Sequence, residues 1–120
     1  MDGLQESVAD LSSLTRVQLE TLKIQLALHN GEINMDQALS LRKNSRISKG
    51  THYRILAQAR SNLKASLLTV AVAAQIGVVN PEDVDKLMAT MKLIPSDVDE
   101  EKLPEVLALV RAVVDRIVML

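Results

Sequence analysis

The chain has 120 residues, a formal net charge of −1 and 48% hydrophobic residues. This length suits one compact domain with a single core and is too short for two comfortable ones. The sequence contains no Cys, Phe or Trp. A disulfide framework, a thiolate metal site and the aromatic platforms that stack single-stranded bases are therefore excluded.

The first two predicted elements are helices. Apolar residues recur at three- and four-residue spacings over 11–28, and Gly31 follows them, which predicts an amphipathic helix that ends at a glycine. Asn34 or Asp36 caps a second predicted helix over 35–43.

Ser48 is the predicted N-cap of a third helix, which starts near Lys49. The apolar spacing remains helical as far as Gly77. This pattern fits one continuous rod or two helices with a break near 61–62. It also leaves a short strand within 65–79 open.

Asn80 and Pro81 predict the start of a further helix over about 81–91, because they combine a cap with proline at the first helical position. An acidic connection over 97–101 follows, and the last helix opens near Leu103. Its apolar stripe is too wide for packing on one face, so either the rest of the monomer or a second copy must cover it. We expect a homodimer in which this helix contributes Val106, Val110, Val113, Val114, Ile117 and Leu120.

The expected fold is therefore all-α, a bundle of about five helices that contains a helix-turn-helix. Residues 8–64 would form the helix-turn-helix-like part, and residues 65–120 the helical core and dimerisation part of the same single domain. The longest apolar stretch is shorter than the roughly twenty residues of a membrane span, and no leader opens the chain. We expect a soluble, cytoplasmic protein with no membrane partner.

Positive charge is concentrated in the middle of the chain. Residues 42–64 hold seven lysines and arginines and no acid, whereas both flanking segments are net acidic. Such asymmetry draws a polyanion to one segment. On a helix, Lys49, Tyr53, Arg60 and Lys64 form one stripe, and Arg54, Gln58 and Ser61 form a second polar stripe beside it.

The segment 47–56 resembles the helix-turn-helix of DNA-binding transcription regulators. The matching residues are Ile47, Ser48, Thr51, Arg54, Ile55 and Leu56. The resemblance implies that Ile47 closes the turn, Ser48 caps a recognition helix and Thr51 contacts phosphate. It covers about twenty residues, with 11–28 as the supporting first helix. Two features depart from the pattern: the distance from Ala38 to Ile47 is several residues longer than usual, and His52 stands where a branched aliphatic residue is common.

Together, the charge and the resemblance predict a homodimer that binds double-stranded DNA through a basic recognition helix over about 49–64. The expected phosphate contacts are Ser48, Lys49, Thr51, Arg54, Arg60 and Lys64, and the expected base contacts are His52, Tyr53 and Gln58. The other expected contacts are Arg42, Lys43 and Arg46.

A non-enzymatic helical adaptor of a nucleic-acid-processing complex, with an acidic protein partner, fits the same charge. A ligand-sensing regulator with a pocket within 65–120 is a third possibility. We expect no enzyme, because no nucleophile stands beside a base and the Ser61-to-Lys64 spacing lacks the companion motifs of acylating enzymes. We also expect no cofactor and no metal, since His29 and His52 are the only histidines and cysteine is absent.

Overall fold

The computed structural model describes residues 3–42 and 47–120. Within these residues the fold consists of six α-helices without a β-strand, so the all-α prediction is confirmed. The helices are α1 (Gly3–Asp10), α2 (Arg16–His29), α3 (Met35–Ser40), α4 (Lys49–Gln75), α5 (Pro81–Leu93) and α6 (Leu103–Ile117).

The helix starts follow from capping side chains. Asn34 accepts a hydrogen bond from the Gln37 amide, Ser48 from the Thr51 amide and Asn80 from the Glu82 amide, which confirms these three caps. Each cap satisfies an amide that the first helical turn leaves without a partner.

The helix ends depend on two glycines. Gly31 and Gly77 have φ angles of 74° and 89°, a left-handed conformation that glycine adopts without a steric penalty. Beyond each glycine the next amide bonds back to a carbonyl of the preceding helix: Glu32 to Ala27 and Val78 to Ala73. Both ends are Schellman motifs, so the chain turns sharply at each.

The structure differs from the predictions at the start of the first predicted helix and at the end of the second. Thr15 and Gln18 form a capping box that starts α2 at Arg16, whereas the predicted helix began at residue 11. Residues 3–10 form the separate helix α1, which the apolar spacing did not indicate. The second helix also ends earlier than predicted, with Leu41 as its C-cap.

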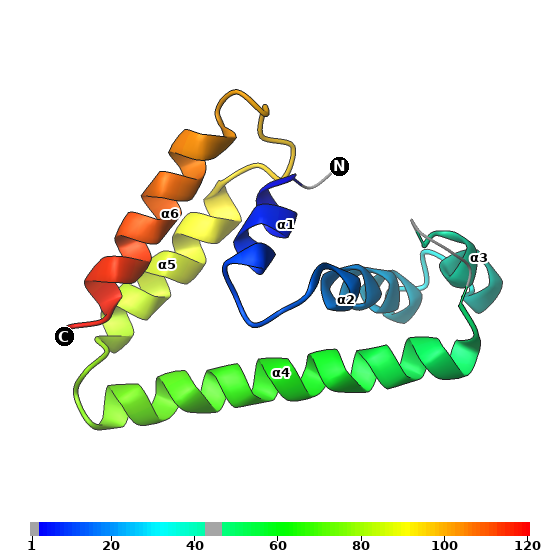
Figure 1. Cartoon of the computed structure of the whole chain (residues 1–120), viewed down its shortest axis with the longest axis horizontal. Coiled ribbons are helices and arrows are strands. Elements are labelled where there is room, and N and C mark those ends of the chain that lie inside the picture. The colour runs from blue at the N-terminus through cyan, green and yellow to red at the C-terminus, as the bar shows by residue number, and fades with distance from the viewer. Residues whose placement is uncertain (1–2, 43–46) are drawn as a thin grey trace.

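Helix α4 is one continuous rod, so the alternatives of a break near 61–62 and of a strand within 65–79 are both wrong. Its 27 residues correspond to about 40 Å, and it runs along most of the molecule (Figure 1). Asn62 does not break it because its side-chain amide points outward, donating to the Ser13 carbonyl at 2.7 Å and to Gln18 Oε1 at 2.9 Å.

The other helices pack at the two ends of this rod (Figure 1). Helix α2 lies against the first half of α4, with α3 beside it, whereas α5 and α6 pair with each other and α1 contacts both α2 and α6. The C-terminal segment returns to the end of α4, where Val79 and Val118 form an isolated bridge.

The buried residues accordingly form two groups. The first group is Thr21, Ile24, Ala38, Leu39, His52, Leu56 and Ala59, and the second is Leu4, Ala9, Val79, Val110 and Ile117. The first group fixes the rotation of α4 about its own axis, which decides the side chains that α4 presents to solvent.

Helix α6 is covered largely from within the chain. Val110 and Ile117 are buried, Val106 and Val113 are half-buried, and Val114 and Leu120 are exposed. Helix α6 packs on α5 and α1. Most of the residues expected at a dimer interface on this helix therefore have partners in the same chain.

Candidate nucleic-acid interface

The outward face of α4 is set by the residues it buries. His52, Leu56 and Ala59 are buried in the half of α4 that packs on α2, and at 100° per residue they occupy one side of the helix. The rest of the circumference of this half carries exposed residues, among them Lys49, Gly50, Tyr53, Arg54, Ala57, Gln58, Arg60, Ser61 and Lys64. We call this set the basic face.

Four cationic side chains of the basic face have no partner among the described residues. Across residues 3–42 and 47–120, the side chains of Lys49, Arg54, Arg60 and Lys64 take part in no hydrogen bond or ion pair. An exposed cation without a carboxylate beside it keeps its full attraction for an anion in solution. By helical phase Lys49, Arg60 and Lys64 lie close together on α4, and Arg54 lies on the neighbouring stripe of the same helix.

At the start of α4, Ser48 and Thr51 bond to each other. Ser48 Oγ accepts from the Thr51 amide at 3.1 Å and donates to Thr51 Oγ1 at 2.9 Å. These two side chains are therefore engaged with each other at the N-terminus, where the helix dipole adds partial positive charge. Lys43 and Arg46, two further predicted contacts, lie outside the described residues.

The structure places Arg42 and His52 in the interior instead of on the basic face. The Arg42 side chain is 5% exposed and His52 is fully buried. Arg42 Nη2 donates to Thr21 Oγ1 at 2.6 Å and lies 3.3 Å from His52 Nδ1, while Nη1 lies 3.6 Å from Glu20 Oε1. On the far side of the ring, His52 Nε2 lies 3.1 Å from Gln25 Oε1.

This buried network joins α2, α4 and the segment that follows α3. Because Arg42 follows α3 and its partners lie on α2 and α4, the guanidinium ties all three helices together. The network therefore constrains how α4 lies relative to α2 and to the end of α3. Arg42 and His52 thus support the basic face from behind and leave the contacts with a ligand to exposed residues.

Burial, and secondarily the charge of Arg42, lowers the pKa of His52 below its ordinary value of 6.5. The folded state therefore favours the neutral ring, and this contribution to stability is present above pH 6.5 and is lost as the pH falls below 6.5 towards the folded-state pKa. We expect the free energy of unfolding to drop as the pH falls below 6.5 in the native protein and to drop less in His52→Gln. Urea unfolding across this range measures the difference.

The matched control is His29→Gln, which removes the other, exposed histidine. It should leave the pH profile as it is in the native protein. A profile that His52→Gln does not flatten would contradict the buried neutral ring.

Sequence reasoning missed the small residues at the centre of the basic face. Gly50 and Ala57 lie between the two polar stripes by helical phase, and a shallow depression beside Ala57 is lined by Gln18, Arg54, Ala57, Gln58, Ser61, Asn62 and Ala65. Short side chains between long cationic ones let a helix approach a surface closely. The seven-residue spacing of Gly50 and Ala57 would have indicated that these two small residues share one face of the helix.

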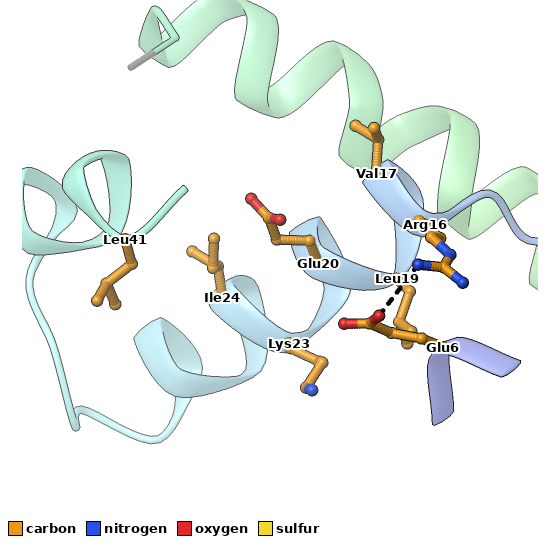
Figure 2. A pocket seen from close by; sticks show the side chains of 8 residues that line it. All are labelled: Glu6, Arg16, Val17, Leu19, Glu20, Lys23, Ile24 and Leu41. Atoms are coloured by element: carbon orange, nitrogen blue, oxygen red, sulfur yellow. Dashed lines mark hydrogen bonds and ion pairs between the residues drawn. The ribbon is translucent and has the colours of Figure 1, made fainter. Parts of the chain in front are cut away.

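Another pocket lies between α1, α2 and the end of α3, with a volume of about 380 Å³. Figure 2 shows Glu6 and Arg16 joined at one end of it and Ile24 and Leu41 at the other. Arg16 also binds Asp10 through Nη2 at 2.7 Å, and the hydrogen bond from Arg16 lowers the pKa of Asp10 below its ordinary value. The charged groups of this pocket hold α1 on α2, which leaves no obvious chemistry for a ligand.

The described residues contain no group of three or more His, Asp or Glu side chains arranged to hold a metal ion. None of their helices combines the length and the apolar character that crossing a bilayer requires. Comparison with known protein families, curated proteins and solved structures gave no match.

Proposed function

We propose that this protein binds duplex DNA through the basic face of α4 and acts as a transcription regulator. The observation that carries the proposal is the set of four exposed cations, Lys49, Arg54, Arg60 and Lys64, whose side chains have no partner in the part of the chain that the structure describes. The major groove is about 12 Å wide and admits one α-helix. In this arrangement the four cations neutralise phosphates, while Tyr53 and Gln58 reach towards base edges.

The order of the helices supports the same proposal. Helix α2 packs on both α3 and α4, and the chain passes from the short α3 to the start of α4 at Ser48. This is the sequence of elements expected of a helix-turn-helix, in which the third helix enters the groove. With Arg42 engaged internally, six cations remain for phosphates: Lys43, Arg46, Lys49, Arg54, Arg60 and Lys64.

The experiment is a salt titration of binding to a labelled random duplex. If six cations neutralise phosphates, the logarithm of the association constant should fall against the logarithm of salt concentration with a slope of about −5, because each contact releases condensed counterions. A slope near zero, or no binding at low salt, would contradict groove binding.

The alternative function is a non-enzymatic adaptor whose basic face meets an acidic protein. The long apolar, exposed part of α4 beyond Lys64 favours some protein contact in either case. Bare protein that leaves a random duplex unshifted at low salt, yet is retained by an immobilised acidic polypeptide in a salt-sensitive way, would support the adaptor over the regulator.

A further inference from the structure

The second half of α4, residues 63–76, is exposed over most of its surface. Every residue over 63–72 is exposed, and Leu67, Leu68 and Ile76 are 71%, 70% and 69% exposed. No other helix of the described chain packs along this half to the extent that α2 packs on the first half. A helix that is apolar on all sides is stable in water only when something covers it.

This span is held at both ends and open between them. Asn62 is bonded to Ser13 and Gln18 at one end, and the Met119 amide donates to the Val78 carbonyl at 2.9 Å at the other. Figure 1 shows the span as the green part of α4 between its contact with α2 and the turn into α5. The exposed helix is therefore a fixed part of the fold and presents a fixed surface.

The chain exposes more surface than a compact monomer of its size. Its accessible surface is 8429 Å², whereas a compact monomer of this mass exposes about 6,400 Å². Its radius of gyration is 16.2 Å, against about 14 Å for a compact domain of this length. The excess surface, about 2,000 Å², exceeds the roughly 800 Å² that each partner buries in a stable complex.

The absence of charge in residues 65–76 favours a second copy of the chain as the partner. Between Lys64 and Glu82 the sequence has no charged residue, so two copies of this span meet without like charges opposite each other. A two-fold interface is self-complementary, with the same patch on both subunits, and an uncharged apolar helix satisfies that requirement by itself. An acidic or basic partner would find no opposite charge here.

We propose that two copies of this protein pair antiparallel through the uncharged part of this span, residues 65–76, which is the end of α4 with its C-cap residue. The midpoint of residues 65–76 lies between Val70 and Ala71, where we place the two-fold axis. Leu67, Leu68 and Val72, on either side of this midpoint, form the centre of the interface. This pairing goes beyond the proposed DNA binding and does not depend on it. The dimer interface predicted on α6 is thereby replaced, since Val110 and Ile117 are already buried within the monomer.

The test is the molar mass in solution, measured by light scattering after size exclusion at micromolar concentration. The native protein should have the mass of a dimer. Leu68→Glu and Leu68→Lys should each halve the mass, because each places like charges across the axis. The matched control is Leu109→Glu on α6, where the native leucine is also exposed, at 52%, and it should remain a dimer.

Mixing the two variants keeps the test valid if either loses stability on its own. Equal amounts of Leu68→Glu and Leu68→Lys should restore the dimer mass, since opposite charges then face each other. A monomeric native protein, a dimer that Leu109→Glu disrupts while both Leu68 variants leave it intact, or a mixture that stays monomeric would overturn the pairing. The salt titration reads DNA binding separately, so either proposal can fail without the other.

Discussion

The double substitution Arg54→Gln and Arg60→Gln is expected to lower the affinity for duplex DNA by about two to three orders of magnitude. Each arginine that contacts a base edge or a phosphate contributes about 1–3 kcal/mol, and each 1.4 kcal/mol is a factor of ten. Both side chains are exposed and unpaired in the described structure. The free energy of unfolding should therefore stay within about 0.5 kcal/mol of the native value.

Fluorescence anisotropy of a labelled duplex at low salt measures this loss. The control is Arg111→Gln with Arg116→Gln, two exposed arginines of α6, which makes the same change in net charge at the other end of the molecule. If the control pair weakens binding as much as the test pair does, the overall charge binds DNA and the basic face does not.

The substitution Arg42→Ala is expected to destabilise the fold by about 3 kcal/mol, because removing one member of a buried ionic network leaves its partners without compensation. Thr21, His52 and Glu20 all lose a contact. The Arg42 Nε is buried without a partner in the described structure, which offsets part of the network's contribution. Arg42→Met keeps the buried stem and should cost less than Arg42→Ala.

Urea unfolding of these variants, with Arg54→Ala as the exposed control, checks the expectation. A native-like stability of Arg42→Ala together with a large loss of DNA affinity would show that Arg42 acts at the surface. Together, the Arg54 and Arg60 variants and the Arg42 variants distinguish a loss of DNA affinity at the surface from a loss of stability in the interior.

Much of the helical framework could be predicted from local chemistry. Asn34, Ser48 and Asn80 each cap a helix through their own side chain, and such a cap needs only neighbours along the chain. The start of α2 could have been predicted in the same way, because Thr15 and Gln18 have the spacing of a capping box. The apolar residues upstream hid this start by continuing the periodicity across the turn.

Other features depend on contacts between distant residues. The continuity of α4 through Asn62 follows from hydrogen bonds to Ser13 and Gln18, more than forty residues away. The burial of Arg42 depends likewise on Thr21, twenty-one residues earlier. A run of positive charges indicates a basic segment, but only the packing of α2 on α4 decides which of its members turn inwards.

The unbroken length of α4 determines how insertions within it would affect the two halves of the helix. Within one helix each residue adds about 1.5 Å and about 100° of rotation. A single insertion near Ala65 would therefore swing the basic face about the axis relative to residues 67–76, whereas inserting seven residues would lengthen the rod and nearly restore the phase. Insertions and deletions in α4 should therefore be tolerated best when the number of residues added or removed is close to whole helical turns.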